Sequence, residues 1–121
     1  MLILSVLGCT SQPVYNVNNE FVPTLRNGST PSFDQVEKAI LSAAYNKGWS
    51  PRIIEPGLIE ARIAVRAHKA TVEISYSESS YNIRYKNSSN LDHENGLIHR
   101  RYNNWIIHLS NAIHSELGVT S

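Results

Sequence analysis

The sequence predicts an α+β fold, a two-layer sandwich in which an antiparallel meander carries two helices on one face, in the order α-β-β-β-β-α. Apolar residues recur at steps of three and four near both ends of the span 32–118, as in amphipathic helices. Between these ends, apolar and polar residues alternate, as in half-buried strands. A chain of 121 residues is long enough for one such core and too short for two.

The first helix is expected over residues 33–47. Ser32 stands three residues before Gln35, a capping-box pattern in which each side chain bonds the backbone amide of the other residue. Asp34 favours the positive end of the helix dipole, and Gly48 supplies a left-handed stop. The buried stripe is expected to consist of Phe33, Val36, Ile40, Ala43 and Ala44.

Four strands are expected to follow this helix. Residues 49–55 indicate an edge strand, because Pro51 lacks the amide that a central strand would use. After the turn signal Pro56-Gly57, the alternation of apolar and polar residues predicts a meander with one face covered by the helices and one wet face, which is exposed to solvent. The residues assigned to the covered face are Ile59, Ala61, Ile63, Val65, Ala70, Val72, Ile74, Tyr76, Tyr81, Ile83 and Tyr85.

The turn lengths predict a register for the meander. A two-residue loop at 67–68 places Arg62 opposite Glu73, and a four-residue loop at 77–80 places Glu73 opposite Arg84. Each charge pair in such a ladder would contribute about a few tenths of a kcal/mol. The apolar pairs expected on the covered face are Ile63 with Val72, Ala61 with Ile74, and Ile74 with Ile83.

The second helix is expected after a loop at 87–96, from about Ile98 to a stop at Gly118. Its apolar residues recur at helical spacing over about five turns, so that one face of the helix must be buried. The covered face of the sheet is the natural partner. The stripe consists of Ile98, Tyr102, Trp105, Ile106, Leu109, Ala112, Ile113 and Leu117.

The beginning of the chain carries a different kind of signal. The run 2–7 is apolar but far too short to span a bilayer, and it leads to Cys9, the single cysteine of the chain. One cysteine excludes an internal disulfide. The motif Val6-Leu7-Gly8-Cys9 resembles the lipobox of bacterial lipoproteins, and the whole chain looks like a small lipoprotein of Gram-negative bacteria.

The resemblance implies a cellular location for the protein. Residues 1–8 would be the end of a truncated lipoprotein signal peptide, and Cys9 would be lipidated. Thr10 in the next position implies the periplasmic side of the outer membrane, with the inner membrane or the cytoplasm as alternatives. Residues 9–31 are rich in Ser, Thr, Asn and Pro and predict a polar tether, of which Glu20–Leu25 packs on the domain as an edge segment.

Candidate functional residues gather around the loop before the second helix. The five histidines lack the spacing of a helical metal pair, and neither a nucleophile motif nor a phosphate-binding glycine loop occurs. We therefore expect no catalytic residue, metal or cofactor. Polar side chains of the loop and the helix would instead form a rim for a peptide, glycan or protein partner. This candidate rim consists of Asp92, His93, Glu94, His99, Arg101, Asn103 and Asn104.

These observations favour a lipid-anchored envelope protein that acts as a non-catalytic binding or adaptor module. One alternative is a small envelope hydrolase that uses Asp92, Glu94 and either His93 or His99. Another is a soluble cytoplasmic protein whose first ten residues form a strand. A net charge of +1 and strand tyrosines on the covered face argue against a nucleic-acid partner.

Overall fold

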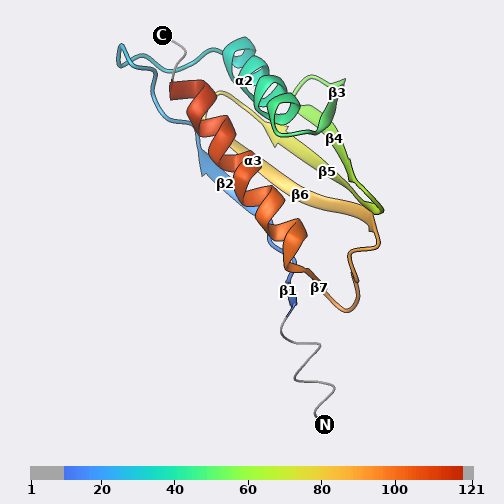
Figure 1. The fold of residues 1–121 in the computed structure, drawn as a ribbon. Helices are drawn as coiled ribbons and strands as arrows, with labels where there is room; N and C mark the ends of the chain where they lie inside the picture. Colours follow the sequence, from blue (N-terminus) through green and yellow to red (C-terminus); the bar gives the residue numbers. More distant parts are fainter. Residues whose placement is uncertain (1–9, 119–121) are drawn as a thin grey trace.

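The structure is a computed structural model that describes residues 10–118. It confirms a mixed α+β fold, with two helices and two antiparallel sheets of five and two strands in this part of the chain. In Figure 1 both helices lie side by side in front of the larger sheet. No helix among these residues is long and apolar enough to cross a membrane. The elements are β1 (Ser11–Pro13), β2 (Val17–Phe21), α2 (Phe33–Asn46), β3 (Ser50–Glu55), β4 (Leu58–Val65), β5 (His68–Tyr76), β6 (Ser80–Ser89), β7 (Leu97–His99) and α3 (Arg100–Gly118).

The larger sheet has the strand order β2-β6-β5-β4-β3. Strands β3 to β6 form the predicted antiparallel meander. Two further strands were not expected, β1 and β7, which pair to form the small sheet, and β2, which pairs with β6, overlaps the edge segment predicted at 20–25. Strands β1 and β7 have three residues each, too few for an alternating pattern to mark them in the sequence.

Much of the segment predicted to be a tether packs on the domain. Ser11 pairs with His99, and the backbone amide of Arg100 donates to the carbonyl oxygen of Thr10 at 2.8 Å. An edge segment is present as expected, although its strand, β2, begins before the predicted range. Val22, which follows β2, is buried. Paired strands therefore precede residue 32, where the domain was predicted to begin.

Helix α2 has the termini that the sequence predicts. The amide of Gln35 donates to Ser32 Oγ at 3.1 Å, and the amide of Ser32 donates to Gln35 Oε1 at 2.8 Å, so that both halves of the capping box are present. At the other end, Gly48 has a φ of +90° and the amide of Trp49 donates to the carbonyl of Ala44 at 2.9 Å. This Schellman motif ends the helix one residue earlier than predicted.

The predicted register between β4 and β5 is wrong by two residues. The hairpin turn consists of Arg66 and Ala67, with Val65 paired to His68. Arg66 has a φ of 59°, in the left-handed region that such a turn requires and that a non-glycine residue seldom adopts. The observed apolar pairs are Ile63 with Ala70, Ala61 with Val72, and Ile59 with Ile74.

A shift of two residues leaves every side chain on its own face of the sheet. The alternation therefore predicted which side chains are buried, although the predicted cross-strand pairs between β4 and β5 were wrong. Ile59, Ile74 and Ile83 are fully buried, and only Val65 of the assigned covered face is substantially exposed. Between β5 and β6 the predicted pairs are correct, including Ile74 with Ile83.

Helix α3 begins two residues later than the apolar spacing suggested, because Ile98 belongs to β7. Ile98 is nevertheless fully buried, as are Tyr102 and Ile106 on the helix itself. The two helices meet through the edge-to-face contact of Trp49, which follows α2, with Trp105 of α3, their ring centroids 6.5 Å apart. The core thus fills the space between the helix pair and one face of the larger sheet.

Candidate functional site

Two groups of residues were predicted to carry function. Cys9, the predicted lipidation site, lies outside the described residues. The candidate rim along the loop before α3 and the helix itself is described in full, and the structure gives its members different roles.

The loop residues Asp92, His93 and Glu94 are all exposed. The ring of His93 lies against the ring of Tyr85, with centroids 4.3 Å apart, and the backbone of Glu94 pairs with that of Leu97. No hydrogen bond joins the three side chains to one another in the described structure, and no group of three metal-binding side chains occurs among residues 10–118. In the described structure these three side chains thus face solvent, and one of them, His93, contacts an aromatic ring.

The rim residues at the start of α3 divide into one that supports the helix and two that face solvent. His99 Nδ1 accepts a hydrogen bond from the amide of Arg101 at 3.0 Å, which satisfies one of the free amides of the first turn. The side chains of Arg101 and Asn104 are exposed. Of the candidate rim residues in the first turns of α3, these two are therefore the ones with exposed side chains.

Asn103 is a structural residue. It is 5% exposed. Its Oδ1 accepts from the amide of Tyr15 at 3.0 Å, and its Nδ2 donates to Gln12 Oε1 at 3.0 Å and to the carbonyl of Pro13 at 2.9 Å. The side chain thus fastens the segment that contains β1 to α3, and its amide has little capacity left for a ligand.

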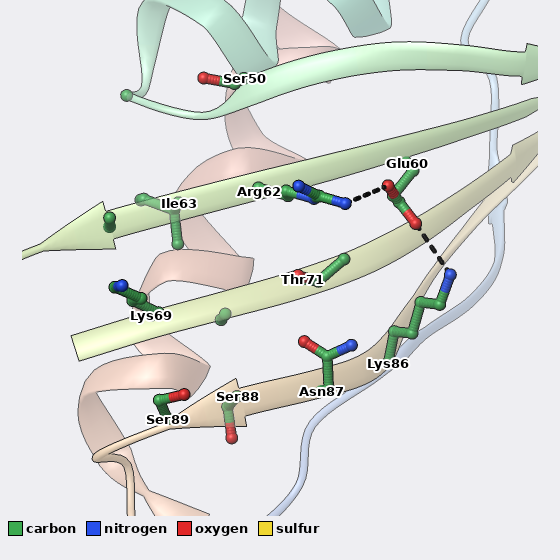
Figure 2. Close-up of a pocket in the computed structure, with 13 residues that line it drawn as sticks. Ser50, Glu60, Arg62, Ile63, Lys69, Thr71, Lys86, Asn87, Ser88 and Ser89 are labelled. Atoms are coloured by element: carbon green, nitrogen blue, oxygen red, sulfur yellow. Dashed lines mark hydrogen bonds and ion pairs between the residues drawn. The ribbon is translucent and has the colours of Figure 1, made fainter.

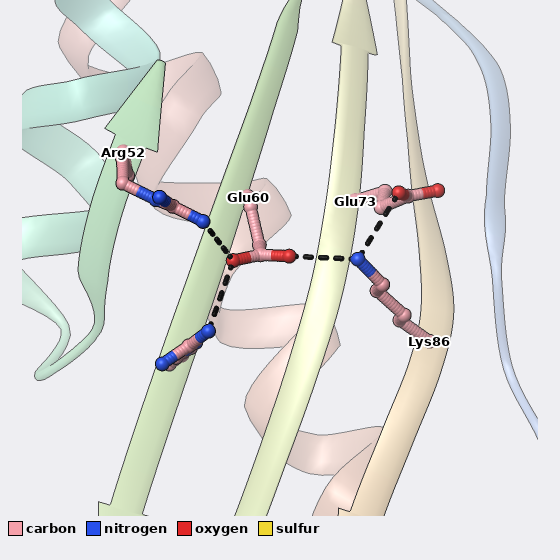
Figure 3. Close-up of polar contacts among 5 residues, drawn as sticks. Arg52, Glu60, Glu73 and Lys86 are labelled. Carbon is pink, nitrogen blue, oxygen red and sulfur yellow. Dashed lines mark hydrogen bonds and ion pairs between the residues drawn. The ribbon is translucent and has the colours of Figure 1, made fainter. Parts of the chain in front are cut away.

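A second polar cluster, which the sequence did not reveal, lies on the other face of the larger sheet (Figure 3). Its centre is Glu60 of β4, only 6% exposed. Glu60 Oε1 lies 3.0 Å from an Arg52 nitrogen and 3.4 Å from an Arg62 nitrogen. Glu60 Oε2 lies 2.8 Å from Lys86 Nζ, which is also 3.7 Å from a carboxylate oxygen of Glu73.

The register creates this cluster. Glu60 pairs with Arg52 on one side and with Glu73 on the other, so that two carboxylates stand directly opposite each other. Like charges in such positions repel. A bulge in β6 offsets this repulsion. The pairing with β5 shifts between Thr71 and Val72 and leaves Lys86 as the extra residue in β6. The ammonium group of Lys86 contacts both carboxylates.

The surrounding cations keep Glu60 ionised. Hydrogen bonds from Lys86 and Arg52 lower the pKa of the Glu60 carboxyl from its ordinary 4.5 to about 2. The same contact raises the pKa of Lys86. A carboxylate with so low a pKa is a poor general base near neutral pH, so the cluster can hold cations in place but is unsuited to proton transfer.

Beside this cluster the sheet surface forms an open hollow of about 770 Å³ (Figure 2). Figure 2 shows Arg62, Thr71 and Asn87 in one row across three strands, with Lys69 and Ser89 in the next. The lining residues are Gly48, Ser50, Glu60, Arg62, Ile63, Ala64, Lys69, Ala70, Thr71, Lys86, Asn87, Ser88 and Ser89. The polar part of the lining therefore consists of hydroxyl, amide and cationic groups with the carboxylate of Glu60, and Ile63, Ala64 and Ala70 add apolar surface.

The sequence contained part of the information needed to predict this surface. The wet-face positions of the strands hold Arg62, Lys69 and Lys86, which alternation identifies correctly. Their convergence on Glu60 depends on the turn at Arg66 and on the bulge in β6, and neither has a sequence signature here.

The fold and this surface together define a small α+β domain whose larger sheet has one face covered by helices and one open, positively charged face. No protein-family model, no curated protein and no solved structure matches the chain. The residues of this surface and their geometry are therefore the features that indicate a function.

Proposed function

We propose that this protein is a lipid-anchored component of the Gram-negative cell envelope, attached through Cys9 on the periplasmic side of the outer membrane, and that its domain is a non-catalytic binding module. The observation that carries the anchor is the place of the lipobox-like motif. Val6–Cys9 ends directly before Thr10, whose carbonyl is already bonded to the domain. Cys9 itself lies outside the described residues, so the attachment role rests on the apolar run 2–7 and on the motif that leads to this cysteine.

The docking of β1 determines how such an anchor would hold the domain. Thr10 is fixed through Arg100, so a single peptide unit separates Cys9 from the folded chain. Acyl chains contribute roughly 0.8 kcal/mol per buried CH₂, and several chains together hold a protein stably at a bilayer. The end of the molecule with β1, β7 and the first turn of α3 would then face the membrane (Figure 1).

The open face of the sheet is the surface that we assign to binding. Both helices pack against the opposite face, which leaves the cationic side of β3 to β6 free for a ligand. Both carboxylate oxygens of Glu60 contact cations. The loop carboxylates Asp92 and Glu94 are exposed, and neither is bonded to a histidine in the described structure. These features support binding in preference to catalysis.

Metabolic labelling tests the anchor. We expect the protein, expressed in its native host with an alkyne-tagged palmitate, to take up the label and to fractionate with membranes. Cys9→Ser should lose both properties. Ser5→Ala, which changes a residue before the lipobox-like motif, is the matched control and should keep both. An unlabelled wild-type protein that fractionates away from membranes would contradict the anchor.

A further inference from the structure

The hollow on the open face has an excess of positive charge. Arg62, Lys69 and Lys86 line it, and Glu60 is the one carboxylate among its lining residues in the described structure. Three cations against one carboxylate leave two positive charges, and this excess stays the same when Glu73 and Arg52, which contact the lining residues Lys86 and Glu60, are included. An open hollow with such an excess attracts small anions.

Lys69 is the cation with the most freedom to bind. It lies on β5, between Ala64 of β4 and Ser89 of β6, and its side chain is exposed. No acidic group lies within ion-pair distance of Lys69 among residues 10–118. Its ammonium group can therefore bind an external oxyanion without breaking a contact within the protein.

Arg62 of β4 is a second cationic donor among the residues that line the hollow. Its contact with Glu60 is long, at 3.4 Å, and its side chain is 68% exposed. A guanidinium group has five N–H donors, so most of them remain available. The contact turns the guanidinium group toward Glu60, and the N–H donors that it leaves free are the ones that an oxyanion in the hollow would use.

Neutral donors and acceptors complete the surface. Thr71 and Asn87 lie in the row of Arg62, and Ser89 lies beside Lys69. Hydroxyl and amide groups both donate and accept, which suits the hydroxyl groups of a sugar. A hollow of about 770 Å³ also lies in the size range of small-molecule sites.

We propose that this hollow binds a small sugar that carries an oxyanion, either a phosphate or a carboxylate. Lys69 and Arg62 contact the oxyanion, and Thr71, Asn87 and Ser89 contact the sugar hydroxyls. This proposal rests on the binding role given above to the open face and does not depend on the lipid anchor.

Amide chemical-shift titration of the full chain carrying Cys9→Ser tests the proposal, because this variant has no lipid and an unaltered sheet face. The probes are glucose 6-phosphate, glucuronate and neutral glucose. We expect saturable shifts in the five contact residues with at least one anionic sugar and none with glucose. The anionic sugar with the lower Kd identifies the oxyanion as phosphate or carboxylate.

A pair of charge-matched variants tests the role of Lys69. Lys69→Gln should raise the Kd of the tighter probe by about tenfold or more, since one charge-assisted hydrogen bond is lost. Lys38→Gln removes the same charge from an exposed position on α2 and should change the Kd by less than about twofold. The proposal is overturned if neither anionic sugar gives saturable shifts, or if both variants weaken binding equally. Either result would leave the labelling test of Cys9 unaffected.

Discussion

At the scale of single residues, two buried tyrosines differ in the partner of the hydroxyl group. Tyr81 Oη lies 2.7 Å from Ser110 Oγ, whereas Tyr102 Oη is buried with no hydrogen-bond partner in the described structure. Burial raises the pKa of Tyr81 to about 12 and raises that of Tyr102 further, so both phenols stay neutral. An unpaired buried hydroxyl costs about 1–3 kcal/mol of stability.

The matched substitutions to phenylalanine should therefore have opposite consequences. Tyr102→Phe removes an unsatisfied group, so we expect the free energy of unfolding to stay the same or to rise by about 1 kcal/mol. Tyr81→Phe removes a hydrogen bond and leaves Ser110 without that partner, so we expect a loss of about 1 kcal/mol. Urea denaturation monitored by circular dichroism measures both. Equal destabilisation by the two substitutions would show that Tyr102 has a partner.

Glu60 should make the stability of the protein depend on pH in the acidic range. Its pKa in the folded protein, about 2, lies below its ordinary value of 4.5. Its contribution is thus fully present above about pH 4.5 and is lost as the pH falls toward 2. We expect Glu60→Gln to lower Tm at pH 7, and the difference from wild type to shrink between pH 4.5 and 2.

The control for this titration is Glu78→Gln, which removes a carboxylate from an exposed turn. This variant should have a Tm within about 1 °C of wild type at pH 7, because an exposed charge outside such a network contributes little. If the Tm of Glu60→Gln and the Tm of Glu78→Gln depend on pH in the same way from pH 7 to pH 2, the cations around Glu60 do not stabilise its charged form.

At the scale of secondary-structure elements, the attachment of β1 depends on one side chain from the opposite end of the chain. Strand β1 has three residues, so its ladder with β7 is short. The three hydrogen bonds of Asn103 to the segment 12–15 supplement that ladder. At about 1 kcal/mol for each hydrogen bond, this clamp is comparable with the pairing that it supports.

Asn103→Ala should release β1 while the larger sheet stays folded. We expect amide exchange at Tyr15, whose N–H loses its acceptor, to accelerate by at least about tenfold, and the global free energy of unfolding to fall by about 2–3 kcal/mol. Hydrogen exchange followed by NMR measures both quantities. Asn104→Ala, on the exposed side of the same helix turn, is the control and should leave Tyr15 protected. Unchanged exchange at Tyr15 in Asn103→Ala would contradict the clamp.

The elements that the sequence predicted well are those with local causes. The capping box of Ser32 and Gln35 and the stop at Gly48 depend on neighbouring residues, and both are present. Alternation assigned the covered face correctly at every position except Val65, because it needs only the period of a strand. The helix ends and the buried face of each strand depend on a few consecutive residues, so they could be predicted from the sequence.

The features that the sequence could not supply depend on distant partners or on unusual turns. Arg66 adopts a left-handed conformation for which arginine gives no signal, and this turn places Glu60 rather than Arg62 opposite Glu73. Asn103 was predicted to face a ligand, but its partners come from a strand about 90 residues away in the chain. The candidate binding surface was missed for the same reason, since its centre depends on this register.

At the scale of the whole molecule, the proposed anchor and the proposed binding face have a defined relation. The chain enters the domain beside the first turn of α3, and the helix runs away from that point along the sheet (Figure 1). At 1.5 Å per residue, the 19 residues of α3 extend roughly 28 Å. An anchor at Cys9 without an intervening tether would therefore hold the two ends of α3 at different distances from the bilayer.

This orientation can be measured with fluorescent labels, because a lipidated Cys9 does not react with thiol reagents and the chain has no other cysteine. Asn104→Cys and Ser115→Cys introduce exposed thiols eleven residues apart on α3, roughly 16 Å along the helix axis. In vesicles that contain brominated lipids, which quench fluorescence at short range, we expect strong quenching of the label at 104 and weak quenching at 115. Equal quenching at both positions in a protein that does carry the lipid would mean that the domain lies flat on the membrane or moves freely, and that β1 detaches from α3 when the anchor inserts.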